Sequence, residues 1–367
     1  MAGKILNYYA GGNTARGFYS LYESNLQNLN KLFILKGGPG TGKSTLMKDV
    51  GNAFTEKGYH IEYLHCSSDN SSIDGVIIPA IKAGIVDGTA PHVIEPKAPG
   101  AIEEYVNLGV AWDTAKLAPL KDRILELTNK SSTAFHTAYS LFGEALRVHD
   151  EWEKIYIENM DFEKVNQFTI ELTSKLFGEG GASGSSVEKA PVWHRFLGAA
   201  TPIGAVDYVQ NLTEGLPKRY FIKGRPGSGK STLLKKLVAH AEQNGLEVEV
   251  YHCGFDPNSL DMVIVRKLGF AIFDSTAPHE YFPSRDGDEI IDMYDRFITP
   301  GTDEKFHVEI TEISARYKAK MEEAISYLAQ AKAFHDELEA VYRPAMDFEE
   351  ISRITAEIKA QLLNMID

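Results

Sequence analysis

The chain repeats itself. Shifting the 367-residue sequence by 187 positions places residues 31–92 on residues 218–279 without a gap, and 26 of the 62 aligned pairs are identical. Chance would give only a few identities over such a length, so the sequence is a tandem duplication. Both halves must then adopt the same fold, which restricts the chain to an architecture that can be built twice within it.

The similarity continues outside this block. Upstream, Gly11-x-x-Thr14-x-x-Gly17 falls on Gly198-x-x-Thr201-x-x-Gly204 at the same offset. Downstream, after a one-residue deletion, His149-Asp-Glu-Trp and Met160-Asp-Phe-Glu fall on His335-Asp-Glu-Leu and Met346-Asp-Phe-Glu. Between the halves, the Gly- and Ser-rich residues 178–191 are expected to form a flexible linker, because they cannot bury a core. We therefore predict two domains, residues 1–177 and 192–367.

Short apolar runs and glycine stops predict an α/β fold in each half. Strands are expected at 5–10, 32–36, 59–66 and 83–87, and at 192–199, 219–223, 246–253 and 270–274. Helices are expected at 42–58 and 73–82, at 229–245 and 260–267, and directly after the first strand of each half. Because short parallel strands joined by helices form a sheet covered on both faces, each core (5–112 and 192–300) is predicted to be a three-layer sandwich with a parallel sheet between helices.

Beyond each core the composition changes. Long stretches rich in Ala, Leu, Glu and Lys predict a helical hairpin appended to each copy, at 113–177 and 301–367. Asp161 and Asp347 are expected to be the N-caps of the second helix in each hairpin. Such a hairpin would serve either to pack against a neighbour or as a lid or partner-binding arm.

Charge and hydropathy exclude several classes of partner. With 38 Lys and Arg against 51 Asp and Glu, the net charge of -13 predicts no binding to nucleic acid or to an anionic membrane. No stretch approaches the ~20 apolar residues that span a bilayer, and the first residues lack the apolar run of a signal peptide, so a cytoplasmic location is expected. The two cysteines, Cys66 and Cys253, exclude a disulfide framework.

Two glycine-rich loops carry the clearest chemical signal. Each satisfies G-x-x-x-x-G-K-[ST] between a predicted strand and a predicted helix. They are Gly37-Gly38-Pro39-Gly40-Thr41-Gly42-Lys43-Ser44-Thr45 and Gly224-Arg225-Pro226-Gly227-Ser228-Gly229-Lys230-Ser231-Thr232. The glycines let successive backbone N–H groups face phosphates, and the helix N-terminus adds its positive dipole end. Lys43 and Lys230 are expected to reach the β- and γ-phosphates, and Ser44 and Ser231 to ligate Mg²⁺.

Both halves resemble P-loop NTPases, and the duplicated arrangement resembles an uncharacterised family of bacterial and archaeal tandem P-loop ATPases. The resemblance implies ATP and Mg²⁺ as ligands, with an Asp at the end of an apolar strand that holds Mg²⁺. Asp87 and Asp274 fit this role, although a carboxylate that only caps a turn is the alternative. AAA-type and ABC-type ATPases commonly place Glu directly after this Asp to polarise the attacking water. Here Gly88 and Ser275 follow it, which argues against those two subfamilies.

Further candidates follow the second and third strands. His92 and His279 end the shared pattern Asp-x-Thr-Ala-Pro-His, at the sheet edge where α/β proteins bind ligands. They are expected either to sense the γ-phosphate or position water, or only to fix their loop. Asp69 and Asp256 occupy the place where P-loop kinases often carry a base for an acceptor hydroxyl. The alternative is a loop carboxylate that bonds its own backbone.

Two other repeated pairs are given structural roles. Asp74 and Asp261 are expected to cap a helix N-terminus. His65-Cys66 and His252-Cys253 end the second strands, but adjacent strand residues point to opposite faces, which disfavours a shared metal ion.

The leading functional hypothesis is a Mg²⁺-dependent ATP-binding NTPase with two nucleotide sites, at which water attacks the γ-phosphoryl group. One alternative is a small-molecule or nucleotide kinase that uses Asp69 and Asp256 as bases. Another is a slow nucleotide-gated switch or scaffold that binds a protein partner through its helical arms.

Joining two copies through a linker raises their effective concentration to about the millimolar range, which predicts an intramolecular pseudo-dimer with coupled sites. In P-loop ATPases that pair, one subunit often supplies a positive group to the site of its neighbour. The candidates for that group are Arg16, Arg195, Arg225 and Arg285.

Overall fold

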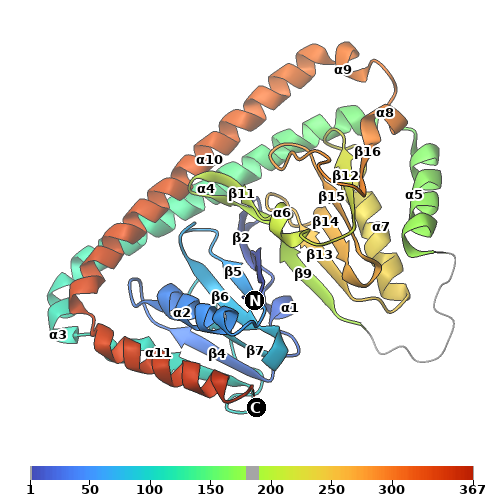
Figure 1. The fold of residues 1–367 in the computed structure, drawn as a ribbon. Coiled ribbons are helices and arrows are strands. Elements are labelled where there is room, and N and C mark those ends of the chain that lie inside the picture. Colours follow the sequence, from blue (N-terminus) through green and yellow to red (C-terminus); the bar gives the residue numbers. More distant parts are fainter. Residues whose placement is uncertain (1, 179–189, 367) are drawn as a thin grey trace.

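The computed structural model describes residues 2–178 and 190–366 and contains two six-stranded sheets with helices packed against them (Figure 1). The first sheet has the order β1 (Ile5–Tyr8), β5 (Ile61–His65), β6 (Ile73–Ile78), β7 (Ala83–Asp87), β4 (Lys31–Lys36) and β8 (Glu103–Asn107). The second has the matching order β9 (Val192–Phe196), β13 (Val248–His252), β14 (Leu260–Val265), β15 (Phe270–Asp274), β12 (Lys218–Lys223) and β16 (Asp288–Asp292). The predicted linker at 178–191 falls mostly outside the described residues.

The α/β class is confirmed, but the sheets are mixed. All neighbouring strands run parallel except β6 and β14, each of which is antiparallel to both of its neighbours. The helices predicted at 73–82 and 260–267 are therefore wrong. Both segments are continuous, fully buried runs rich in β-branched residues, and a short apolar run of that kind fits a strand as well as a helix. Only one turn, η1 (Pro79–Ile81) or η4 (Arg266–Leu268), follows each run, which is too short for a parallel crossover.

A second difference lies after the first strand of each half, where a hairpin replaces the predicted helix. The hairpins are β2 (Gly11–Thr14) with β3 (Gly17–Ser20) and β10 (Gly198–Thr201) with β11 (Gly204–Asp207), followed by the short helices α1 (Tyr22–Asn25) and α6 (Val209–Leu212). The Thr14 and Thr201 hydroxyls donate to the carbonyls of Gly17 and Gly204 at 2.8 and 2.6 Å and close the turns, which explains the repeated Gly-x-x-Thr-x-x-Gly pattern. β2 pairs with β10, so the two hairpins form one four-stranded sheet across the halves.

The two faces of each sheet are covered differently. On the outer faces, α2 (Lys43–Glu56) and α7 (Lys230–Gln243) begin at the predicted positions and bury Leu, Val and Phe side chains. The inner faces share one apolar cluster with α1 and α6. Its buried members come from both halves and include Tyr8, Tyr22, Leu64, Val209, Leu212, Phe221, Tyr251 and Phe273. A complete helical layer covers only the outer face, so the predicted three-layer sandwich is incomplete within each half.

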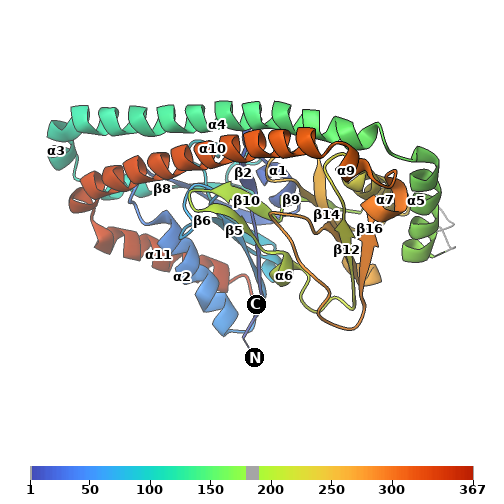
Figure 2. The same cartoon turned by 90° about the horizontal axis from the view of Figure 1, so that it is seen from above.

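Two long antiparallel helices connect the cores. α4 (Lys121–Ile157) follows η2 (Leu108–Ala111), α3 (Thr114–Leu117) and η3 (Ala118–Leu120). α10 (His307–Tyr342) follows α8 (Met293–Phe297) and α9 (Thr302–Lys305) and ends at η5 (Arg343–Ala345). At 1.5 Å per residue, the 37 residues of α4 extend ~55 Å, and the two helices lie side by side along the molecule (Figure 2). Ala138, Phe142, Ala324 and Leu328 pack between them.

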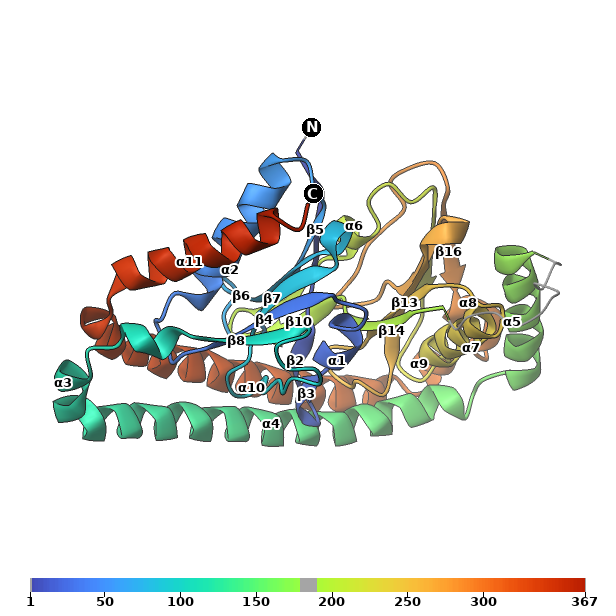
Figure 3. The same cartoon turned by 90° about the horizontal axis from the view of Figure 1, so that it is seen from below.

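The helices after the long pair are exchanged between the halves. α5 (Phe162–Phe177) packs on the second core through Val165 and Leu172, and α11 (Phe348–Leu363) packs on the first core through Ile351, Ile354 and Ile358 (Figure 3). The second helix of each predicted hairpin, in 113–177 and in 301–367, therefore packs on the core of the other half. A helix as long as α4 carries the chain past its own sheet, so that the following helix reaches the sheet of the other half.

The turns before α5 and α11 are held by hydrogen bonds to the helix that follows and to the other half of the chain. Asp161 and Asp347 are N-caps, as predicted, and their carboxylates accept bonds from N–H groups of the first turn. Their own N–H groups donate to carbonyls of the other half, Phe297 at 2.8 Å and Ala111 at 2.9 Å. Among the helices of residues 2–178 and 190–366, none combines the length and apolar character needed to cross a bilayer.

Candidate functional site

The two glycine-rich loops lie between β4 and α2 and between β12 and α7, as predicted. Gly42 and Gly229 are the N-caps, with φ of 82° and 86°, and neither supplies a side chain to cap its helix. Neither helix has an acidic residue in its first turn. The first N–H groups of both helices are therefore left for an anion, and the helix dipole favours one there.

The motif lysine and the strand-end aspartate lie together in both halves. Lys43 Nζ donates to two carbonyl oxygens of its own loop, at 2.8 and 2.9 Å, and lies 3.6 Å from Asp87 Oδ2. Lys230 Nζ donates to one loop carbonyl at 2.9 Å and lies 3.5 Å from Asp274 Oδ2. This proximity follows from the pairing of β7 with β4 and of β15 with β12, which ends the two strands side by side.

The other atoms around this pair are also held in place. Asp87 Oδ1 accepts from the N–H and hydroxyl of Thr89 at 2.8 and 2.6 Å, so only Oδ2 faces the lysine. The Thr276 N–H and hydroxyl hold Asp274 Oδ1 in the same way. Ser44 Oγ accepts from Ile73 N at 3.0 Å, and Ser231 Oγ accepts from Leu260 N at 3.0 Å. Ammonium, hydroxyl and carboxylate thus converge at each loop.

Asp74 and Asp261 do not cap helices, because their segments are the buried strands β6 and β14. Burial and the nearby charge of Asp274 raise the pKa of Asp261 to about 6, and burial raises the pKa of Asp74 as well. With Asp87 and His92, Asp74 forms a group whose donor atoms lie within 4.8 Å of one another and could hold a metal ion. Sequence reasoning missed this role, although an Asp within an apolar, repeated run was the available signal.

The two loop histidines differ in their partners. His92 Nε2 lies 3.2 Å from the carboxylate of Asp74 on β6. His279 Nδ1 lies 2.8 Å from Asp207 of β11, which also accepts from the Tyr281 hydroxyl at 2.6 Å. Burial alone would lower the pKa of His279, but the bond to Asp207 and nearby carboxylates raise it above its ordinary value. Both histidines are thus fixed by carboxylates.

Asp69 and Asp256 are each bonded to their surroundings. Asp69 accepts from the N–H and hydroxyl of Ser71 and from the Ser72 hydroxyl at 2.8 to 3.0 Å, and it lies 3.5 Å from Lys332 of α10. Burial raises the pKa of Asp69, but these bonds outweigh it and the net pKa is lowered. Asp256 accepts from Arg16 Nε at 2.8 Å. Such bonding suits a loop carboxylate better than a proton acceptor.

Of the four candidate arginines, Arg16 alone contacts a candidate site residue of the other half. Arg195 is buried and pairs with Glu62 of the first half, and Arg225 pairs with Asp303 of its own half. Arg285 donates to a backbone carbonyl at 2.8 Å.

The His-Cys pairs lie at the carboxyl ends of β5 and β13. His65 bonds Asn7 and burial lowers its pKa to about 4, while burial raises the pKa of both cysteine thiols. In the described part of the chain, neither pair belongs to a group that could hold a metal ion.

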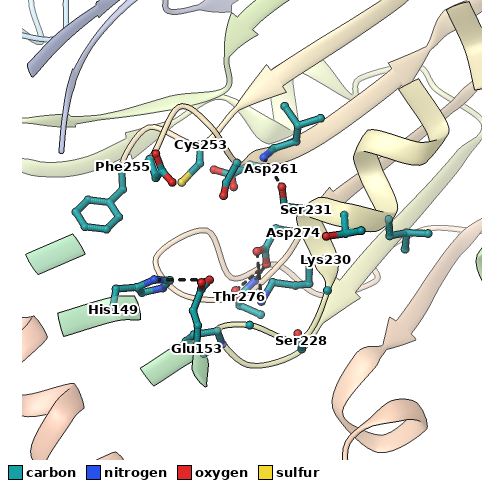
Figure 4. A pocket seen from close by; sticks show the side chains of 18 of the residues that line it. His149, Glu153, Ser228, Lys230, Ser231, Cys253, Phe255, Asp261, Asp274 and Thr276 are labelled. Atoms are coloured by element: carbon teal, nitrogen blue, oxygen red, sulfur yellow. Dashed lines mark hydrogen bonds and ion pairs between the residues drawn. The ribbon is translucent and has the colours of Figure 1, made fainter. Parts of the chain in front are cut away.

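A cavity of about 520 Å³ opens beside the second glycine-rich loop. Lys230, Ser231, Asp261 and Asp274 line one side of it, and α4 of the first half lines another (Figure 4). α4 lies so close that a Cβ on Gly227 would be 2.5 Å from the Glu153 carbonyl oxygen. At the first loop, a Cβ on Gly40 would be 3.3 Å from the Glu339 carbonyl oxygen of α10. Each loop is therefore in contact with the long helix of the opposite half.

Comparisons with protein-family models, curated proteins and solved structures find no match to this chain. The resemblance to tandem P-loop NTPases stays a prediction from the motifs.

Proposed function

We propose that this chain is a duplicated P-loop NTPase that binds Mg²⁺ and ATP at two sites and hydrolyses the γ-phosphoryl group. The observation that supports it best is the triad of motif Lys, strand-end Asp and motif Ser at an uncapped helix N-terminus, present in both halves. No acidic side chain occupies the first turn of either helix, and a helix N-terminus with an ammonium group beside it suits a polyphosphate. The donor set therefore fits the two ligands.

Mg²⁺ would be held by Ser44 with Asp87, and by Ser231 with Asp274, and would supply charge neutralisation at the phosphates. Lys43 and Lys230 would stabilise the charge that develops as the phosphoryl group is transferred. The loop N–H groups would orient the triphosphate. Catalysis in this scheme consists of positioning and electrostatics, which require rigid groups. Asp87 and Asp274 are rigid in this sense, because each carboxylate accepts two hydrogen bonds from a neighbouring threonine.

The shared hairpin sheet, the common apolar cluster and the exchanged α5 and α11 support the proposal that the two halves work as an intramolecular pseudo-dimer. The long helices α4 and α10 already pack against each other and against the glycine-rich loops, so the proposal that they form a protein-binding arm has less support. The kinase alternative needs Asp69 and Asp256 as free bases, and their bonds to Ser71 and Arg16 speak against that role.

The test is equilibrium binding of Mg·ATP by calorimetry, together with a phosphate-release assay. We expect about two nucleotides per chain, lost in Lys43→Ala with Lys230→Ala. Asp87→Asn with Asp274→Asn should reduce turnover more than binding, because a carboxylate near the metal mainly serves the transition state. Folded wild-type protein that binds no nucleotide would refute the proposal, and turnover that requires an acceptor alcohol would favour a kinase.

A further inference from the structure

The proposed hydrolysis needs a group that accepts a proton from the attacking water. The residues after Asp87 and Asp274 are Gly88 and Ser275, and neither side chain can act as that base. The base therefore has to come from elsewhere, and each site is bordered by one element of the opposite half that carries carboxylates.

That element is the C-terminal part of a long helix. On α4, His149 and Glu153 line the cavity beside Lys230, and Figure 4 shows both side chains directed into it, across from the Lys230–Asp274 pair. His149 Nδ1 lies 3.7 Å from the Glu153 carboxylate. Burial lowers the pKa of His149, and the carboxylates of Glu153 and Asp150 oppose this shift.

The same His-Glu pair recurs on the helix beside the first loop. His335 Nδ1 lies 3.8 Å from the Glu339 carboxylate on α10, and the donor atoms of His335, Asp336 and Glu339 lie within 4.8 Å of one another, as do those of His149, Asp150 and Glu153. The backbone of each glutamate contacts the glycine-rich loop of the other half, at Gly227 and at Gly40. Both contacts are in register with the repeat, and both helices carry the same His-Asp-Glu-x-Glu pattern at this point.

We propose that Glu153 is the catalytic base of the second nucleotide site and Glu339 that of the first, so that each half completes the active site of the other. The inference rests on the proposed hydrolysis. The water oxygen forms a bond to the γ-phosphorus while its proton passes to the glutamate carboxylate. The bond between the γ-phosphorus and the bridging oxygen breaks, and the electron pair leaves with ADP. The glutamate then releases the proton to solvent.

The first test is Glu153→Gln with Glu339→Gln, compared with wild type. We expect turnover to fall ~10²- to 10⁴-fold, the usual contribution of a general base, while Mg·ATP binding is retained. Glu126→Gln and Glu322→Gln are matched controls on the exposed faces of α4 and α10, in pairs with Lys130 and Lys318, and should leave turnover unchanged.

The second test distinguishes the two halves. With the second site disabled by Lys230→Ala, Glu339→Gln should abolish the remaining turnover and Glu153→Gln should leave it unchanged. With Lys43→Ala the pattern should invert. The opposite pattern would assign each glutamate to its own half and overturn the inference.

Two further outcomes separate this inference from the proposed function. Turnover that survives both Gln substitutions would overturn the inference and leave the proposed hydrolysis intact. Wild-type protein without turnover would overturn both. If a Gln variant fails to fold, the Asp variant at the same position, which withdraws the carboxylate, should lower turnover at least about tenfold, and unchanged turnover would again refute the role.

Discussion

The two candidate sites share their loops, lysines and strand-end aspartates, but each neutralises its loop carboxylate differently. Asp69 is paired with Lys332 of α10, and Asp256 is paired with Arg16 of the β2–β3 turn. In both cases the cation comes from the opposite half. The repeat counterparts of these cations are apolar, since Leu146 corresponds to Lys332 and Ile203 corresponds to Arg16. Each loop carboxylate is thus paired with a cation, but the cation comes from a different element in the two sites.

The two cores show a similar contrast. Arg219 of β12 and Asp288 of β16 form a buried ion pair in which both side chains are 1% exposed. At the same register of the first sheet, buried Leu32 faces Glu103, whose carboxylate accepts a bond from Ala98 N. One fold therefore accepts either an ion pair or an apolar side chain at this point. The stability of the second core therefore depends on the charge of Asp288, whereas in the first core the described residues at this position, Leu32 and Glu103, form no buried ion pair.

The largest expected effect concerns this ion pair. Asp288→Asn leaves the Arg219 guanidinium buried without its counter-ion and should destabilise the protein by about 3–5 kcal/mol in urea unfolding at pH 7. Glu103→Gln keeps an acceptor for Ala98 N and should cost less than about 1 kcal/mol. Equal effects of the two substitutions would remove the contrast between the cores.

The same pair makes an acid-dependent contribution. Bonds from Arg219 and from backbone N–H groups lower the pKa of Asp288 from 3.8 to about 2 in the folded protein. The corresponding stability, about 2.5 kcal/mol, is complete above about pH 4 and is lost as the pH falls through about 2. The difference between wild type and Asp288→Asn should therefore narrow between pH 4 and pH 2, and a constant difference would contradict this assignment.

A smaller effect is expected at the glycines that meet the opposite helix. Gly227 and Gly40 both have a positive φ, 72° and 68°, so alanine costs about 1 kcal/mol at either. At Gly227 the new Cβ also meets the Glu153 backbone at 2.5 Å, whereas at Gly40 the nearest atom is 3.3 Å away. Gly227→Ala should destabilise the protein by about 1–2 kcal/mol more than Gly40→Ala.

Gly17→Ala isolates the backbone cost, because φ is 85° there and no atom lies within 4 Å of the added Cβ. If Gly227→Ala destabilised the protein no more than Gly17→Ala, α4 would be able to move away from the loop without cost. The close approach of α4 to Gly227 would then contribute nothing to stability.

The smallest effect is expected from the cations that pair with the loop carboxylates. Lys332→Met should lower turnover at the first site about two- to fivefold, because the pair orders the segment that ends at Ile73 N, the donor to Ser44. Arg16→Met should do the same at the second site. Both side chains are partly exposed, so each change in stability should stay below about 1 kcal/mol. The two sites can be measured separately, the first in the Lys230→Ala background and the second in the Lys43→Ala background. If Lys332→Met lowered turnover at the second site, or Arg16→Met at the first, the two cations would have to be assigned the other way round.

Much of each core could be predicted from the sequence, because its signals are local. The apolar runs before Gly37 and Gly224, the glycine stops and the Asp161 and Asp347 caps act over a few residues, and each produced the expected element. The placement of Asp87 beside Lys43 followed from the same pattern, since parallel strands that end together bring their next residues together.

The sequence alone did not determine the direction of every strand or the core against which each helix packs. Ile73–Ile78 has the apolar content of a buried helix or a buried strand, and the short connection after it decided for an antiparallel strand. The helical pattern of α4 and α10 revealed that long helices exist, but a helix carries no local record of which core its far end will reach. The exchange of α5 and α11, the pairing of Arg16 with Asp256, and the approach of Glu153 and Glu339 to the opposite loops arise from contacts between residues far apart in the chain, and only the tertiary structure decides those.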